Sequence, residues 1–217
     1  MKHPQPPLGK PRRGVVDKDY AAIKRATEER IQWPRIVSSH EWKWVENARS
    51  VSIYTKEGVS PSSGFSVFAT GLIKGTMDEI AEVLQPSSQQ DFEDQMLAFH
   101  GKPFKHGTWI PIVANDDPTE GVRETLSIRS ATFAGPGWLR QRESWCFLDS
   151  TKRDDKQFER YMTALPLEDA QVGDKRRELK TDGVNSLADV ICAFRVQAQE
   201  QLEGEPACVR LHFFAEM

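Results

Sequence analysis

Hydrophobic and polar residues alternate with a period of two over much of the chain, which predicts a protein rich in half-buried β-strands. The segment 51–55 shows this alternation, and it resumes over 65–73 after a turn rich in serine, proline and glycine at 59–64. The two segments therefore predict a hairpin. Further strands are predicted over 109–113, 126–133, 139–148 and 158–165.

A helix is predicted before the first strand. Asp17 can cap a helix that continues through Gln32, with Pro34 as its stop signal. Trp42 and Trp44 follow at strand spacing and share one face of the extended chain. An N-terminal helix that leads into a hairpin is thus the expected beginning of the fold.

Two more helices are predicted between the early and the late strands. Thr76 and Glu79 have the spacing of a capping box, so one helix begins after Thr76 and ends before Pro86. The next helix is short, and its apolar residues recur at i, i+4 and i+7, which indicates a single apolar face. These residues are Phe92, Met96 and Phe99.

The segment 186–202 fits two structures. Leu187, Ile191 and Phe194 have helical spacing, whereas a period of two over 190–196 fits a strand that β-propensity favours. Periodicity alone leaves both open. The last segment alternates clearly and predicts a final strand, with one apolar face formed by Val209, Leu211, Phe213 and Ala215.

Length and charge restrict the classes of function. A chain of 217 residues fits one domain, expected over 17–217, behind a proline-rich basic arm at 1–16 that we expect to be disordered. The net charge of -3 gives no basic field for nucleic acid. No secretory signal and no apolar run of about 18 residues is present, which predicts a soluble cytoplasmic protein.

The chain shows no sequence pattern of a catalytic or metal site. It has no GxSxG elbow, no glycine-rich phosphate loop and no dinucleotide fingerprint. Its three cysteines contain no CxxC pair, and His100 and His106 lack the spacing of a zinc site. We therefore expect no enzyme, no cofactor and no metal.

The order of these elements carries a resemblance to a known family. The supporting segments are the tryptophans around 42–44, a strand that runs into a helix over 69–80, a glycine-proline loop at 134–138, and the strands that follow. In these features the chain resembles START-like (steroidogenic acute regulatory protein-related) lipid-binding domains, most of all those abundant in oomycetes. The resemblance implies an α+β helix-grip fold, in which a curved antiparallel sheet and helices surround an apolar cavity. It also implies that 190–196 is a strand paired with 208–215.

The resemblance implies non-enzymatic binding of a lipid or another apolar small molecule. An arginine that faces the cavity, such as Arg142, would be costly to bury unless it met a polar head group, and the alternative is that it faces solvent. Two other functions stay open: a scaffold that binds protein without a ligand, and a cyclase- or hydratase-like enzyme. The candidate lipid-binding residues are Trp109, Ile128, Arg142, Trp145, Phe147, Met162 and Phe194.

The glycine-proline loop is the candidate for transient membrane contact, which would make the protein peripheral to membranes. Pro136 lies between two glycines, and Trp138 and Leu139 follow it. By resemblance the loop lies beside the cavity mouth, and an indole suits the membrane interface. The alternative is that Trp138 folds back into the core.

Family members continue from the last strand into a long C-terminal helix that covers the cavity. The sequence given ends at Met217, directly after the last strand. We therefore expect the lid helix to be missing and the cavity to be partly open.

Overall fold

The computed structural model describes residues 19–57, 64–115, 122–135, 142–166, 169, 184–186, 189–200 and 206–217. The proposed basic arm at 1–16 lies outside these residues, so its predicted disorder stays a prediction. No helix in the described ranges has both the length and the apolar composition needed to cross a membrane.

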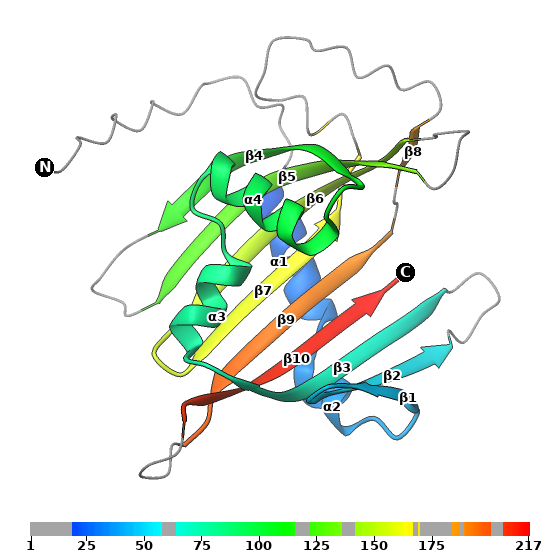
Figure 1. Ribbon diagram of the computed structural model, residues 1–217, viewed down its shortest axis with the longest axis vertical. Coiled ribbons are helices and arrows are strands. Elements are labelled where there is room, and N and C mark those ends of the chain that lie inside the picture. The colour runs from blue at the N-terminus through cyan, green and yellow to red at the C-terminus, as the bar shows by residue number, and fades with distance from the viewer. Residues whose placement is uncertain are drawn as a thin grey trace, which may run out of the picture.

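One curved sheet organises the structure (Figure 1). Among the described residues, nine strands follow in the order β1-β2-β3-β10-β9-β7-β6-β5-β4, and each neighbouring pair is antiparallel. This confirms the α+β class and the antiparallel sheet. Strand β8, which the sequence did not predict, pairs in parallel with β6. The strands are β1 Lys43–Ala48, β2 Val51–Glu57, β3 Phe65–Lys74, β4 Phe104–Asn115, β5 Arg123–Ala134, β6 Arg142–Arg153, β7 Gln157–Ala164, β8 Val184–Ser186, β9 Ile191–Ala198 and β10 Cys208–Glu216.

The ambiguous segment near residue 190 is a strand. Strand β9 pairs with β10 from Val209 opposite Ala198 to Glu216 opposite Ile191, as the resemblance implied. Strand β10 also pairs with β3, so the last strand joins the N-terminal hairpin to the later strands. The two parts of the chain thus form one continuous sheet because β10 pairs with a strand on each side.

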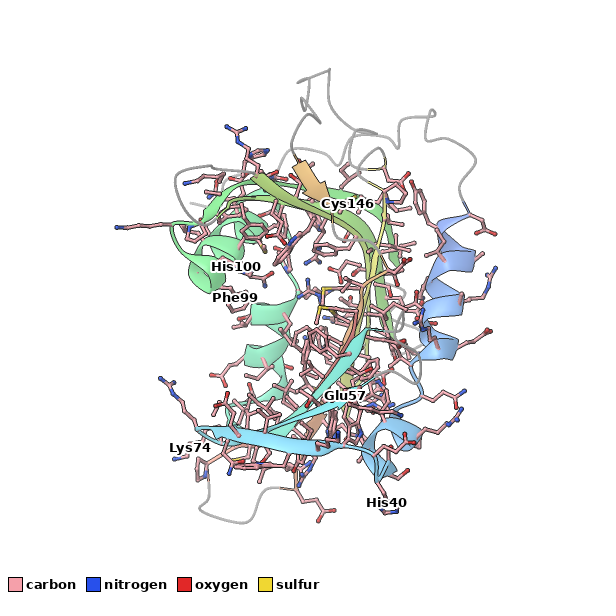
Figure 2. The ribbon with its side chains drawn as sticks, turned by 90° about the vertical axis from the view of Figure 1, so that its right-hand side faces the viewer. His40, Glu57, Lys74, Phe99, His100 and Cys146 are labelled. Carbon is pink, nitrogen blue, oxygen red and sulfur yellow. The ribbon has the colours of Figure 1, made fainter. Side chains whose placement is uncertain are left out.

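Helices cover both faces of the sheet. Helices α1 (Tyr20–Arg30) and α2 (Trp33–Ser38) lie on the outer, convex face (Figure 2). Helices α3 (Met77–Leu84) and α4 (Gln89–His100) lie on the opposite side, inside the curve of the sheet (Figure 2). We call the side covered by α3 and α4 the inner face.

The N-terminal helix is shorter than the sequence suggested. Asp19 caps it by accepting a hydrogen bond from the Ala22 amide, and the helix ends at Arg30. Pro34 was expected to end this helix, but it lies in the first turn of the next helix, α2. Proline is tolerated there since the amide that it lacks would have no intrahelical partner.

The predicted capping box of α3 is confirmed. The Thr76 amide donates to Glu79 Oε2 at 2.7 Å, and the Glu79 amide donates back to Thr76 Oγ1 at 3.2 Å. This pair satisfies two amides that a helix start otherwise leaves unbonded. It fixes α3 directly after β3 and thereby places the helix over the inner face.

The packing under α1 shows which residues of β5 and β6 face outward. Tyr20 of α1 packs on apolar side chains from β5 and β6, among them Ile128, which is 1% exposed. Side chains alternate between the faces of a strand, so the neighbours of Ile128 at 127 and 129 point to the inner face. The buried members of this outer cluster are Tyr20, Leu126, Ile128, Cys146, Leu148 and Leu165.

Candidate functional site

Strand register determines which side chains meet on the inner face. Arg129, Phe147 and Ala164 are opposite one another on β5, β6 and β7, and directly opposed residues share a face. Two residues further along, at the next position that faces inward, Asp149 is opposite Met162. The inner face therefore combines apolar side chains with charged ones.

Helix α3 covers the part of the inner face that β7, β9 and β10 form. Its residues Met77, Ala81 and Leu84 are buried against Phe158 and other apolar side chains of β7, β9 and β10. Burial of each large side chain of this kind contributes about 1.5–3 kcal/mol. This part of the inner face is therefore a packed core.

Helix α4 covers the part of the inner face that β4, β5 and β6 form, through the buried side chains of Phe92 and Met96. Phe92 is 0% exposed, whereas Phe99 on the same helix is 55% exposed. The predicted single apolar face of this helix is therefore only partly buried. His100, at the end of α4, contacts the aromatic rings of Phe133 and Trp145 edge-on, with centroids 4.9 Å and 5.6 Å away.

Beside these two covered regions the inner face carries large apolar side chains that stay half-buried, and one of them, Phe194, packs against the cluster under α3. Phe194 and Phe213 lie side by side on β9 and β10, with ring centroids 4.9 Å apart. Met162 on β7 and Phe147 on β6 are half-buried too. We call Phe147, Met162, Phe194 and Phe213 the inner strip.

A buried ionic cluster lies beside the inner strip. Arg160 Nε donates a hydrogen bond to Asp149 Oδ1 at 2.9 Å. Arg129 Nη2 lies 2.5 Å from Asp149 Oδ2 in a close ion pair that lacks hydrogen-bond alignment, and Arg129 Nε donates to Ser127 Oγ at 3.2 Å. The side chains of Arg129 and Asp149 are 1% and 0% exposed, and that of Arg160 is 7% exposed. We call Arg129, Asp149 and Arg160 the ionic cluster.

The pKa of Arg129 is lowered to about 10, chiefly by burial; the charge of Asp149 opposes this shift and that of Arg160 adds to it. Arg129 therefore remains a cation near neutral pH. The guanidinium carbon also lies 5.7 Å from the centre of the Phe92 ring, so α4 seals this end of the ionic cluster.

Cys192 is the thiol that lies on the inner face, opposite Met162. Burial raises the pKa of this thiol to about 11, although the nearby Arg160 lowers it. The protonated thiol is a poor nucleophile at neutral pH. In the described residues, no three His, Cys, Asp or Glu side chains are arranged to hold a metal ion.

The structure brings most of the candidate lipid-binding residues together on the inner face. Trp109 and Trp145 are part of the aromatic cluster under α4, and the other three belong to the inner strip. These five are Trp109, Trp145, Phe147, Met162 and Phe194.

The remaining candidates lie elsewhere. Ile128 is on the outer face under α1, and Arg142 is exposed at the start of β6, in phase with the outer face. Ile128 therefore does not line the inner face, and Arg142 fits the solvent-facing alternative that the sequence left open. Pro136, Trp138 and Leu139 lie outside the described residues, so membrane contact there stays a prediction.

Sequence reasoning missed the ionic cluster. A signal for it was present, because Asp149 is in phase with Trp145 and Phe147 along β6, and Arg129 is in phase with Phe133 along β5. A charged residue at an inward phase of a buried strand indicates a partner charge. The partners themselves come from three different strands.

Comparisons with solved structures agree with this architecture. Human StAR-related lipid transfer protein 5 superimposes with a TM-score of 0.58 at 14% identity, over 91% of this chain and 82% of that one. The fold is the START helix-grip fold. Human STARD10 superimposes with a TM-score of 0.50 at 10% identity, over 92% of this chain and 66% of that one. No protein-family model matches the chain, and no curated protein sequence does.

Proposed function

We propose that this protein binds a lipid or another apolar small molecule on the inner strip and does so without catalysis. The observation that carries the proposal is the set of large apolar side chains left half-buried inside the curve of the sheet. A ligand that covers them removes apolar surface from water, at about 25 cal/mol for each Å².

The fold supports a binding role of this kind. The superimposed human protein is by its name a lipid transfer protein, and the two chains share their fold. Inward-facing side chains of an open curved sheet provide a concave apolar surface, which is the common form of small-molecule sites.

The chemistry of the inner face supports binding over catalysis. Asp149 is fixed in ion pairs with Arg129 and Arg160, and is therefore a poor candidate for a proton carrier. Cys192 remains a thiol because burial raises its pKa. We accordingly propose that the inner face recognises a ligand and leaves it chemically unchanged.

We also propose that the end of the sheet next to α4 approaches membranes transiently. Phe99 is exposed at this end, and His100 beside it contacts Phe133 near the end of β5. The loop with Trp138 and Leu139 follows β5 in the sequence. Exposed aromatic side chains around one end favour the membrane interface.

Native mass spectrometry of the purified protein tests the binding proposal. We expect an added mass that disappears on denaturation and that is identified as a lipid. Phe194→Gln should lower the occupancy or affinity by about tenfold, because it places a polar group in the inner strip. Leu72→Gln is the matched control, since Leu72 is an exposed apolar residue of β3 in phase with the outer face. Absence of ligand, together with no binding of added oleyl alcohol, contradicts the proposal.

A further inference from the structure

The charges of the ionic cluster do not balance. Among the described residues, two guanidinium groups, Arg129 and Arg160, share the single carboxylate of Asp149, which leaves one net positive charge in this part of the structure. All three residues are less than 9% exposed. A buried charge without a counter-charge is costly, so this arrangement favours the approach of an anion.

The ionic cluster also has hydrogen-bond donors to spare. Arg129 Nη1 is buried and has no hydrogen-bond partner in the described part of the chain. Arg160 contacts Asp149 through Nε, and its two Nη groups donate no hydrogen bond to any described residue. A guanidinium fork suits the two oxygens of a carboxylate or the oxygens of a phosphate.

Of the two arginines, Arg160 has the more exposed side chain, 7% against 1% for Arg129. Phe92 of α4 covers Arg129, whereas Arg160 lies opposite Phe194 in the strand register and next to the inner strip. Phe213 continues the same row on β10. A head group at Arg160 thus leaves the apolar chain in contact with Phe194 and Phe213.

We propose that the ligand is a lipid with an acidic head group, a carboxylate or a phosphate monoester, which binds to the Nη groups of Arg160 while its chain lies on the inner strip. This inference rests on the proposed function and narrows it to a class of ligand. The head group supplies the negative charge that the ionic cluster lacks. A neutral lipid of the same chain length fills the inner strip but leaves the buried positive charge unbalanced.

Pairs of ligands with the same chain test the inference on the wild-type protein by isothermal titration. Oleate should bind at least about tenfold more tightly than oleyl alcohol, because hydrogen bonds to charged groups are the stronger ones. Oleoyl lysophosphatidate and monooleoylglycerol repeat the comparison for a phosphate head, and the tighter acidic ligand identifies the preferred head group. Equal affinity within both pairs overturns the inference while leaving the proposed function intact. No binding of any of the four overturns both.

Two variants test whether Arg160 is the residue that gives the preference for oleate over oleyl alcohol. Arg160→Gln should bring oleate affinity down to that of oleyl alcohol and leave oleyl alcohol affinity unchanged within about twofold. The control is Arg195→Gln, which removes an arginine from the neighbouring strand β9 on the outer face, where it pairs with Glu159 at 2.8 Å. The control should keep the preference for oleate. Undiminished preference in a folded Arg160→Gln protein overturns the assignment to Arg160.

A spectroscopic measurement separates recognition from a merely structural role of Arg160. With oleate labelled with ¹³C at the carboxyl, the bound carboxylate should stay ionised to a lower pH in the wild-type protein than free oleate does in detergent micelles. A bound carboxyl that titrates as in micelles contradicts contact with the guanidinium. This readout needs no variant, so the inference is tested even if Arg160→Gln does not fold.

Discussion

The imidazole of His212 on β10 is stacked on the ring of Phe68 on β3, with centroids 5.9 Å apart and planes inclined by 14°. Trp33 of α2 approaches the same imidazole, with 6.2 Å between centroids. Nδ1 of His212 is buried without a hydrogen-bond partner in the described ranges. Burial, followed by the charges of Arg210 and Arg195, lowers the pKa of His212 below its ordinary value.

This environment predicts a loss of stability in mild acid. The unfolded chain binds a proton at His212 near the ordinary pKa of 6.5, whereas the folded protein binds it only at lower pH. The free energy of unfolding is therefore unaffected by His212 well above pH 6.5 and falls as the pH drops through that value. His212→Phe, which keeps an aromatic ring on Phe68, should show a smaller drop in melting temperature between pH 7.5 and pH 5.5 than the wild-type protein.

The control for this comparison is His40→Asn, because His40 is exposed. It should keep the pH dependence of the wild-type protein. If His212→Phe loses as much stability in acid as the wild-type protein does, His212 is not the responsible group.

Asp149→Asn should destabilise the protein strongly. The substitution leaves the guanidinium groups of Arg129 and Arg160 buried without their counter-charge, at a cost of about 3–5 kcal/mol. Urea denaturation measures the change. Asp78→Asn is the control, because Asp78 pairs with Arg153 while its side chain is 76% exposed, and it should cost less than about 1 kcal/mol. Similar losses for the two variants would argue that the ionic cluster contributes no more than a surface ion pair.

Phenylalanines on one helix should differ sharply in their contribution to stability. Phe92→Ala removes a ring that is 0% exposed between α4 and the sheet, and should lower the free energy of unfolding by about 3–5 kcal/mol. Phe99→Ala removes a ring that is 55% exposed and should change it by about 0.5 kcal/mol or less. Urea denaturation of both variants checks this, and a large loss for Phe99→Ala would place that ring in a packed environment.

Trp138→Ala should weaken binding to liposomes several-fold in co-sedimentation and leave the melting temperature nearly unchanged. The reason is that an interfacial tryptophan contributes to reversible membrane adsorption without packing in the core. Trp44→Ala is the matched control, since Trp44 on β1 is 61% exposed and is remote in sequence from the proposed contact loop. Strong destabilisation of Trp138→Ala with unchanged liposome binding would show a core tryptophan instead.

Local features of the fold were predictable from local sequence. The Thr76–Glu79 capping box formed as expected because its atoms belong to a single helical turn. Strands with an alternating pattern, such as β2 and β3, formed because an antiparallel sheet places alternate side chains of a strand on opposite faces. The segment now seen as β9 was ambiguous by periodicity, and its pairing with β10 agreed with the family resemblance.

The side of the sheet that faces a ligand was not predictable in this way. Strand β5 buries both of its faces, with Ile128 packed under α1 and Arg129 packed under α4. Periodicity separates the two phases of a strand but does not say which helix covers which. Ile128 was therefore a reasonable candidate for the ligand wall, and only the placement of α1 removed it.

The sequence by itself determined the alternating strands, the capping box of α3 and the order of elements, because these depend on neighbours along the chain. The tertiary structure alone decided the ionic cluster. Arg129, Asp149 and Arg160 lie on three strands, and the register between those strands brings their charges into contact. Charges attract at short range whatever their separation in sequence, so the net charge beside the inner strip emerges only once the sheet has formed.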